Sequence, residues 1–436
     1  MTFPVPTRRL AIVSALASLL VLVGPAPWPA VFALNGVLLL LAVADWLLAV
    51  PPEKIGVERD VPGVVPLGQP VEIAWRVSNP ANRRLSVALA DELFPSLHAA
   101  TRRVGVHVPP RGRGTARTTL HPARRGCFEP RELVLRVEGP MGLAARQGRR
   151  QLPGTLRVYP PFRSREEAEL RIDRARILEI GLRSAAGRGG GTEFDSLREY
   201  EIDDEFRRID WAATARVGRT IVRTYRAERN QTVLLLLDSG RMMAGRVSDV
   251  PRLDHAMDAV MMLTAVATRL GDRAGLVAFD REIRAVVPPG HSKDQLTRVT
   301  EAIYAIEPAL VESDYRGAFA QTLARFRRRA LLVIFTELAE QAMAETLLPA
   351  LPLVTRRHLV VVASVTDPEV LRWAHAVPHD AGDSYRKAAA VNSLADRART
   401  VARLRGLGAT VIDAEPGRLA PLLADAYLKV KATGRL

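Results

Sequence analysis

Two apolar stretches near the N-terminus constrain this chain more than any other feature. The first reads LAIVSALASLLVLV over Leu10–Val23, and the second reads VFALNGVLLLLAVADWLLAV over Val31–Val50. A helix of about 20 apolar residues is long enough to cross the hydrocarbon core of a bilayer. The link between the stretches, GPAPWP, is rich in turn-forming residues. We therefore predict a transmembrane helical hairpin over residues 1–52.

Positive charges flank the predicted hairpin at both of its ends. Arg8 and Arg9 precede the first stretch, Lys54 and Arg59 follow the second, and the link carries no charge. Segments rich in Lys and Arg stay on the cytoplasmic side of a membrane. We therefore expect a protein of the inner (cytoplasmic) membrane, with the bulk of the chain in the cytoplasm.

Asp45 lies inside the second apolar stretch, where a carboxylate is costly at membrane depth. It stands within two turns of the expected helix end. Two interpretations remain open, because the side chain can extend to the membrane interface or pair with a group across the hairpin.

The charge balance favours polyanionic partners. The chain has 62 Lys and Arg residues against 47 Asp and Glu residues, a formal net charge of +15. Either nucleic acid or an anionic membrane leaflet fits such a charge. The basic runs, such as Arg327–Arg329, lack the interleaved aromatic residues that single-strand binders use. Nucleic acid is therefore not an expected partner.

The only cysteine is Cys127, which excludes an intrachain disulfide framework and a cysteine-based metal site. This usage fits a reducing compartment. Because Cys127 stands beside a predicted strand, we expect a small buried residue and not a nucleophile.

The middle of the chain has the pattern of a sheet. Short alternating runs such as VEIAWRVSN and RELVLRVEG, separated by Pro and Gly, fill the region from Val57 to Tyr159. This spacing predicts a small antiparallel β-sandwich-like domain over residues 53–160.

A charged segment over residues 161–230 begins with a helical-looking stretch. Gly189, Gly190 and Gly191 lack the Gly-Lys-Ser/Thr ending of a phosphate-binding loop, so a flexible loop is favoured there. Beyond them, charges alternate in sign around apolar residues, which predicts a flap held by ion pairs and anchored by Trp211. Whether these charges only neutralise one another or form a docking surface remains open. The interaction segment comprises Arg198, Glu199, Tyr200, Asp204, Arg207, Arg208, Asp210, Trp211 and Arg216.

From residue 231 to 436, continuous apolar strands alternate with helical patterns, for example TVLLLLD, AGLVAFD, ALLVIFTE and HLVVVASVTD. Strands of this kind belong to a parallel sheet that is covered on both faces. We predict a doubly wound α/β domain with its ligand sites at the carboxyl ends of the strands.

The charged segment also carries a family resemblance. Glu193-Phe194, Leu197 to Tyr200, Asp204, Arg208 to Trp211, Ala215-Arg216 and Glu228-Arg229, followed by a strand that ends in Asp238, resemble the signature of the domain-of-unknown-function-58 family. The resemblance implies an N-terminal membrane hairpin, a β domain and a C-terminal von Willebrand factor A-like domain. It also implies a partner, a MoxR-type AAA+ ATPase. One departure is that Asp203-Asp204 replaces the family's usual Gly-Asp.

The A-like resemblance places a degenerate metal-ion-dependent adhesion site in the C-terminal domain. Its candidate ligands are Asp238, Ser239, Ser313, Asp314, Thr336 and Glu337. Gly240 and Met242 occupy the positions of two ligating hydroxyl residues, and Arg241 adds a positive charge. Because Mg²⁺ requires near-ideal oxygen coordination, we expect it to bind weakly or not at all, and we expect no other cofactor.

These features favour a membrane-anchored scaffold or adaptor that works with the ATPase in protein-complex assembly or maturation. The alternative is an adhesion-type A domain that binds an acidic protein ligand through Mg²⁺. No Gly-x-Ser-x-Gly elbow, His-Glu-x-x-His motif or Cys-His pair is present, and Asp203, Asp204 and Asp210 are better explained as solvated acids than as an acid/base set. We therefore expect a protein without enzymatic activity.

Overall fold

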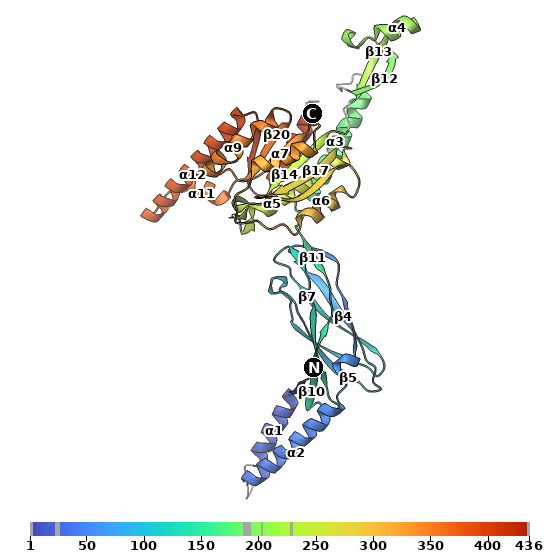
Figure 1. The fold of residues 1–436 in the computed structure, drawn as a ribbon, viewed down its shortest axis with the longest axis vertical. Coiled ribbons are helices and arrows are strands. Elements are labelled where there is room, and N and C mark those ends of the chain that lie inside the picture. The colour runs from blue at the N-terminus through green and yellow to red at the C-terminus, as the bar shows by residue number, and fades with distance from the viewer. Residues whose placement is uncertain (1–2, 22–26, 186–192, 202–203, 227–229, 434–436) are drawn as a thin grey trace. The chain divides into compact units, whose positions relative to one another are not determined.

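The structure of the chain is a computed structural model that describes residues 3–21, 27–185, 193–201, 204–226 and 230–433 (Figure 1). The chain divides into two units, Met1–Tyr159 and Pro160–Leu436. Each unit has its own apolar core.

Two helices, α1 (Arg8–Val21) and α2 (Pro27–Leu48), lie side by side in the first unit (Figure 1). Polar side chains join them, since Ser14 Oγ donates to Asn35 Oδ1 (2.5 Å) and Asn35 Nδ2 donates to Ser18 Oγ (3.1 Å). Among the described residues, one helical segment, Trp28–Lys54, is long and apolar enough to cross a membrane. The 14-residue α1 falls short of that length.

Three sheets build the rest of the first unit. A five-stranded sheet has the order β1-β10-β9-β5-β6, and two three-stranded sheets have the orders β2-β4-β7 and β3-β11-β8. The strands are β1 (Phe3–Pro6), β2 (Gly56–Asp60), β3 (Val64–Pro66), β4 (Val71–Ser78), β5 (Leu85–Asp91), β6 (Arg103–Val108), β7 (Arg113–Leu120), β8 (Gly126–Phe128), β9 (Glu132–Glu138), β10 (Ala144–Gln151) and β11 (Leu156–Tyr159).

Alternate residues of these strands meet in one core, as in Leu133, Leu135 and Val137 of β9 and Ile73, Trp75 and Val77 of β4. Three details differ from the prediction. The sandwich is not wholly antiparallel, because β11 pairs with β3 in parallel. Residues 3–6, which we assigned to the hairpin, form β1 and pair with β10. Cys127, expected to be buried, is exposed because it points out of strand β8.

The last turn of α2 is joined directly to the sandwich. The carboxylate of Asp45 is fully buried, and it accepts hydrogen bonds from the backbone N–H groups of Met141 (2.7 Å), Leu143 (2.7 Å) and Ala144 (2.9 Å) in the β9–β10 turn. Gly139 completes the turn, and a Cβ there would lie 2.3 Å from the Asp45 carboxyl carbon. Asp45 therefore pairs with the sandwich and not across the hairpin.

Arginines of the sandwich satisfy the free carbonyls at the end of α2. Arg146 donates to the carbonyls of Trp46 (2.8 Å) and Leu47 (3.0 Å), and its guanidinium lies 5.1 Å from the centre of the Trp46 ring. Arg83 donates to the carbonyl of Leu48 (2.5 Å). A helix end leaves carbonyls without intrahelical partners, and cations there also interact favourably with the helix dipole. The direction in which α2 leaves the sandwich is fixed by these contacts.

We predict that Asp45→Ala destabilises the first unit by about 2–4 kcal/mol, since three backbone N–H groups lose a charged acceptor in a buried site. Guanidinium unfolding of the full chain in detergent micelles measures the change. Glu53→Ala, at an exposed carboxylate of the same junction, serves as the control and should stay within about 0.5 kcal/mol of the unsubstituted chain. Equal effects of the two substitutions would contradict this role for Asp45.

The second unit contains a six-stranded sheet of order β18-β17-β14-β19-β20-β21. Its strands are β14 (Thr232–Asp238), β17 (Arg273–Phe279), β18 (Ile283–Gly290), β19 (Leu331–Phe335), β20 (Leu359–Val365) and β21 (Thr410–Ala414). All neighbours are parallel except the edge strand β18, which runs antiparallel to β17. The chain first adds strands on one side of β14 and then on the other.

Helices cover both faces of this sheet (Figure 1). Val233, Leu235 and Leu237 of β14 pack in one core, and Leu234 and Leu236 pack in the other. This explains why residues 233–237 of the strand are all apolar. The helices are α3 (Arg165–Ala185), α5 (Arg252–Arg269), α6 (Gln295–Ile303), α7 (Tyr315–Arg325), α8 (Glu340–Glu345), α9 (Leu347–Ala350), α10 (Pro352–Thr355), α11 (Pro368–His375), α12 (Ala381–Gly406) and α13 (Leu419–Ala432).

A small substructure lies between α3 and β14 in the sequence. It contains β12 (Glu193–Glu199), a 3₁₀ turn (Phe206–Arg208), the short helix α4 (Trp211–Val217) and β13 (Ile221–Arg226). The strands β12 and β13 pair antiparallel. We call these four elements the flap.

Candidate functional site

Asp238 is the central residue of the candidate site. It ends β14, the strand at which the sheet order reverses, and its residue is completely buried. In open α/β sheets, ligands bind beside the carboxyl ends of the strands at such a reversal. Thr336 and Glu337 directly follow the neighbouring strand β19, so they stand at the same edge.

Both carboxylate oxygens of Asp238 already accept hydrogen bonds from the protein. Oδ1 accepts from Ser313 Oγ (2.5 Å) and from the backbone N–H of Gly240 (2.8 Å). Oδ2 accepts from Tyr315 Oη (2.6 Å) and from Thr336 Oγ1 (2.9 Å). Of the predicted ligands, Asp238, Ser313 and Thr336 are therefore brought together.

Tyr315, at the start of α7, is the member of this cluster that the sequence analysis missed. Its hydroxyl bridges Asp238 Oδ2 and Thr336 Oγ1, which lies 2.7 Å away. Burial raises the pKa of Tyr315 well above its usual value, and the negative charge of Asp238 raises it further. The phenol consequently stays protonated and donates. A Tyr directly after the Ser313–Asp314 pair was visible in the sequence, but its orientation depends on how α7 packs.

The donors around Asp238 do not fit a Mg²⁺ ion. Gly240 and Met242 offer no hydroxyl, and a Cβ at position 240 would lie 2.1 Å from Ser313 Oγ. Ser313 thus fills the space that a residue-240 side chain would need. Since Mg²⁺ needs about six well-placed oxygen ligands, a carboxylate whose acceptor positions already hold four hydrogen bonds is a poor ligand for it. Within the described ranges, no three His, Cys, Asp or Glu side chains form a metal-binding group.

The other predicted ligands have structural partners. Ser239 Oγ donates to the carbonyl of Phe279 (3.0 Å). The carboxylate of Asp314 accepts from the N–H of Gly317 (2.9 Å) and caps α7. Neither side chain is directed at Asp238 by these contacts.

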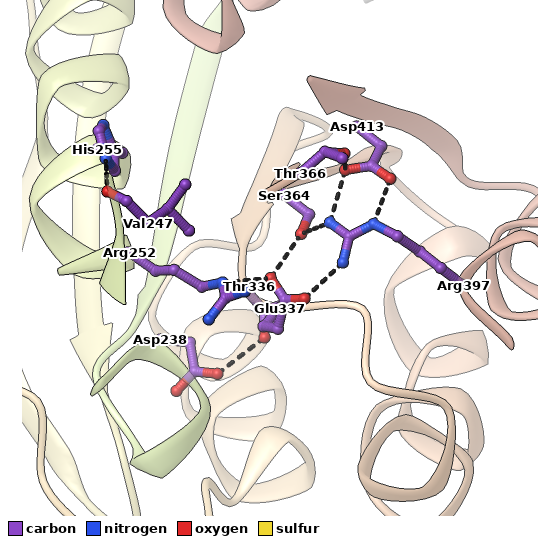
Figure 2. A network of polar contacts seen from close by, with 10 residues as sticks. All are labelled: Asp238, Val247, Arg252, His255, Thr336, Glu337, Ser364, Thr366, Arg397 and Asp413. Atoms are coloured by element: carbon purple, nitrogen blue, oxygen red, sulfur yellow. Dashed lines mark hydrogen bonds and ion pairs between the residues drawn. The ribbon is translucent and has the colours of Figure 1, made fainter. Parts of the chain in front are cut away.

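Glu337 belongs to a second polar network, shown in Figure 2. Its carboxylate is paired with Arg252 (3.0 Å) from α5 and Arg397 (2.5 Å) from α12. Arg397 also pairs with Asp413 of β21 (2.5 Å) and donates to Ser364 Oγ (2.7 Å). Burial opposes the charge of Arg397, but its hydrogen bonds and the charges of Asp413 and Glu337 raise its pKa above the usual value. The network ties strands β19, β20 and β21 to two helices.

A cleft of about 370 Å³ lies at this edge of the sheet. Arg241 and Glu312 form an exposed ion pair (2.7 Å) on its rim. The lining residues are Arg241, Met242, Glu312, Ser313, Tyr315, Ala339, Met343, Glu345 and Thr346.

The flap is held together by ion pairs, as predicted. Arg198 pairs with Asp204 (2.5 Å), Arg223 with Asp210 (2.9 Å), and Arg219 with Glu199 (2.7 Å). Asp210 is also the N-cap of α4, because its Oδ1 accepts from the N–H groups of Ala212 and Ala213, both at 3.0 Å. The Ala213 N–H and the Arg223 guanidinium lower the pKa of Asp210.

Trp211 does not anchor the flap, contrary to the prediction. Among the flap residues whose burial is described, Ile209, Ala213, Ile221 and Val222 are buried, whereas Trp211 is 61% exposed. Its ring packs against another exposed aromatic residue, Phe206, with the ring centres 5.7 Å apart. The first residue of α4 directs its side chain outward because Ala213, two positions later, occupies the buried face.

Other members of the interaction segment surround this aromatic pair in sequence. Arg207 is exposed next to Phe206, and Arg208 pairs with Glu205 (3.2 Å). Arg216 donates to the carbonyl of Ala212 (3.1 Å) on α4, and the Tyr200 N–H donates to the carbonyl of Thr220. The predicted loop residues Gly189 to Gly191, together with Asp203 and the signature residues Glu228-Arg229, lie outside the described residues.

A second, smaller cleft of about 240 Å³ includes two titratable residues of α5, His255 and Asp258. Burial lowers the pKa of His255 and raises that of Asp258, which accepts from the N–H of Ser164 (3.1 Å). No motif in the sequence indicates this pair.

The fold and this site define a multidomain protein with an apolar N-terminal helix and an α/β domain whose buried carboxylate is saturated by protein donors. Residues 196–376 match the family described as "Protein of unknown function DUF58", which confirms the resemblance predicted from the charged segment. The match covers most of the flap and the sheet edge with Asp238.

Similar proteins include uncharacterized proteins of Mycobacterium tuberculosis and Mycobacterium bovis. Each is 27% identical over 249 residues, which are 53% of this chain and 76% of the relative. Among solved structures, a CARDB domain of Pyrococcus furiosus is 13% identical, with a TM-score of 0.17, and covers 26% of this chain and 90% of its own. The C. elegans MSP family member WR4 is 14% identical, with a TM-score of 0.17, over 24% and 96% of the two chains.

We predict that Asp238 stabilises the fold and does not bind Mg²⁺. Asp238→Ala leaves four buried donors without their acceptor and should cost about 3 kcal/mol or more, whereas Tyr315→Phe removes one donor and should cost about 1–2 kcal/mol. Guanidinium unfolding of the full chain measures both values.

Isothermal titration of the full chain with Mg²⁺ completes this test, and no binding heat is expected. A heat of binding that disappears in Asp238→Asn would show that the carboxylate is a metal ligand. Asp425→Asn, at an exposed carboxylate paired with Arg171, is the control for a general loss of negative charge.

Proposed function

We propose that this chain is a membrane-tethered adaptor without enzymatic activity, which uses its flap to bind a cytoplasmic AAA+ ATPase of the MoxR type. Its task is then protein-complex assembly or maturation. The observation that carries the proposal is the exposed Phe206–Trp211 pair beside the exposed Arg207. Trp and Arg are the side chains most enriched in the hot spots of protein interfaces.

The rest of the flap supports a binding role. Leu197 and Val217 are 45% and 59% exposed, so apolar surface is not limited to the aromatic pair. The ion pairs of Asp204 and Asp210 hold the flap in a defined conformation without using these side chains. A preorganised surface loses less entropy when it binds, which favours affinity. The MoxR-type partner itself rests on the family resemblance.

We also assign the α/β domain to the von Willebrand factor A-like class. The strand order, with β14 central and the single antiparallel strand β18 at one edge, supports this assignment. The donors that saturate Asp238 weigh against the alternative function, adhesion to an acidic ligand through Mg²⁺.

Replacing the flap aromatics should abolish binding. We expect Phe206→Ala/Trp211→Ala to lower recovery of the ATPase from solubilised membranes by tenfold or more, since loss of a hot-spot residue costs about 2 kcal/mol or more. Charge reversal at Arg207 and Arg208 should also lower recovery. Recovery is measured by affinity purification of the full chain followed by mass spectrometry.

Trp373→Ala is the matched control, because Trp373 is a partly exposed tryptophan on α11 in the same unit. It should leave recovery unchanged. Recovery that is insensitive to the flap substitutions, or equally sensitive to Trp373→Ala, would rule out docking through the flap.

The proposed topology has its own test. Protease added outside intact cells should leave the region Val57–Leu436 uncut, and permeabilised cells should lose it. The chain should also stay in the membrane pellet after an alkaline carbonate wash, since α2 crosses the bilayer. External cleavage of this region would contradict the cytoplasmic location and the proposed partner.

A further inference from the structure

Several strands of the β-sandwich begin or end on the side where α1 starts and α2 ends. Strand pairing aligns the last residue of β4 with the first of β7 (Ser78↔Arg113), and the first residue of β5 with the last of β6 (Leu85↔Val108). The loops at this end are tied together, because Asn79 Nδ2 donates to the carbonyls of Arg83 (2.7 Å) and Pro109 (2.8 Å). Arg83 in turn contacts the end of α2. We call this the helix end of the sandwich.

The helix end is strongly basic. Its cationic residues are Arg8, Arg9, Lys54, Arg83, Arg84, Arg111, Arg113 and Arg146, against the acidic residues Glu53, Glu138 and the buried Asp45. Arg84, Arg111 and Arg113 are exposed and come from two loops that are far apart in the sequence. Basic residues that adjoin a helix end in the sequence are common. Arg84, Arg111 and Arg113 are distant from α2 in the sequence, and folding brings them to its end.

The apolar surface of α2 continues without a gap up to this end. Leu47 and Leu48 are 58% and 62% exposed in the last turn, and the carbonyl of each accepts a hydrogen bond from a sandwich arginine. If the exposed leucines lie in hydrocarbon, the neighbouring arginines must lie at the depth of the headgroups, whose layer is about 5–7 Å thick on each side. Trp46, beside Arg146, has the amphipathic ring that is typical of this depth.

We propose that the helix end of the sandwich is a binding surface for anionic phospholipid headgroups, with Arg84, Arg111 and Arg113 as its lipid-contacting residues. This proposal rests on the membrane anchoring by α2 that the proposed function includes. Each arginine close to an anionic leaflet raises the equilibrium constant for binding that leaflet by about fivefold. Because Asp45, Arg146 and Arg83 fix α2 against the sandwich, the surface faces the bilayer without a flexible linker.

The test measures which lipid lies next to the helix end. The full chain is placed in nanodiscs that contain equal amounts of phosphatidylglycerol and phosphatidylcholine. A fluorophore is attached at Asn82→Cys, in the loop of Arg83 and Arg84, with Cys127→Ser removing the native thiol. In one sample a small fraction of the phosphatidylglycerol carries a nitroxide near its glycerol backbone, and in a second sample a small fraction of the phosphatidylcholine carries it. We expect the phosphatidylglycerol nitroxide to quench at least about threefold more than the phosphatidylcholine nitroxide.

Three double substitutions locate the effect. Arg84→Glu/Arg113→Glu should bring the quenching ratio close to one, and Arg84→Gln/Arg113→Gln should reduce it partly. Arg102→Glu/Arg103→Glu changes the charge equally but at the opposite end of β6, since Arg103 pairs with Ala90 at the far end of β5. It should leave the ratio unchanged. A fluorophore on the native Cys127 of the otherwise unsubstituted chain should report no preference, because β8 pairs with β11 away from the helix end.

Ionic conditions separate lipid binding from capture of free phosphate. Raising NaCl to about 1 M shortens the screening length to about 3 Å and should collapse the ratio. Inorganic phosphate at the ionic strength of a NaCl control should lower it no more than NaCl does. A ratio of one in the unsubstituted chain, an equal loss in Arg102→Glu/Arg103→Glu, or a specific effect of phosphate would overturn the proposal. A chain that does not incorporate into nanodiscs would instead overturn the anchoring itself.

Discussion

The first unit depends on how one buried carboxylate is satisfied. Asp45 interrupts an apolar helix, and a buried charge without partners is among the most costly features that a protein can contain. Three backbone N–H groups of the β9–β10 turn provide the partners. The residue that looked like a defect in a membrane helix is the reason why that helix and the sandwich form one unit. The orientation of the basic helix end follows directly from it.

The second unit solves a similar problem in a different way. Asp238 is held by hydroxyl groups from Ser313, Tyr315 and Thr336, so the carboxyl edge of the sheet is closed by hydrogen bonds. Glu337 is held at the same edge by Arg252 and Arg397. Acidic residues that would be ligands in an open site act here as connectors between strands and helices. The flap, in contrast, exposes the aromatic side chains of Phe206 and Trp211.

Local pattern was enough to predict the elements that bury apolar residues. The long apolar run of α2, the alternating strands of the sandwich and the apolar strands of the α/β sheet all follow from periodicity, because burial on one or two faces leaves a direct trace in the sequence. The ion pairs of the flap could also be anticipated from the alternating charges.

What the sequence did not predict depends on contacts between distant residues. The partner of Asp45 lies about 100 positions away, Tyr315 acts only through the packing of α7, and Trp211 is exposed because Ala213 faces the flap interior. Cys127 was misjudged because its strand β8 has one open face. In each case the residue type was compatible with either outcome, and tertiary structure decided between them.

The pairing of β1 with β10 has a consequence for biosynthesis. Phe3–Pro6 and both helices leave the ribosome well before residues 139–151, which provide the neighbouring strand and the amide groups for Asp45. During that interval the first strand has no partner and the carboxylate has no donors. Both helices are therefore synthesised while their contacts with the sandwich are still incomplete, and closure of the β9–β10 turn is the event that completes them.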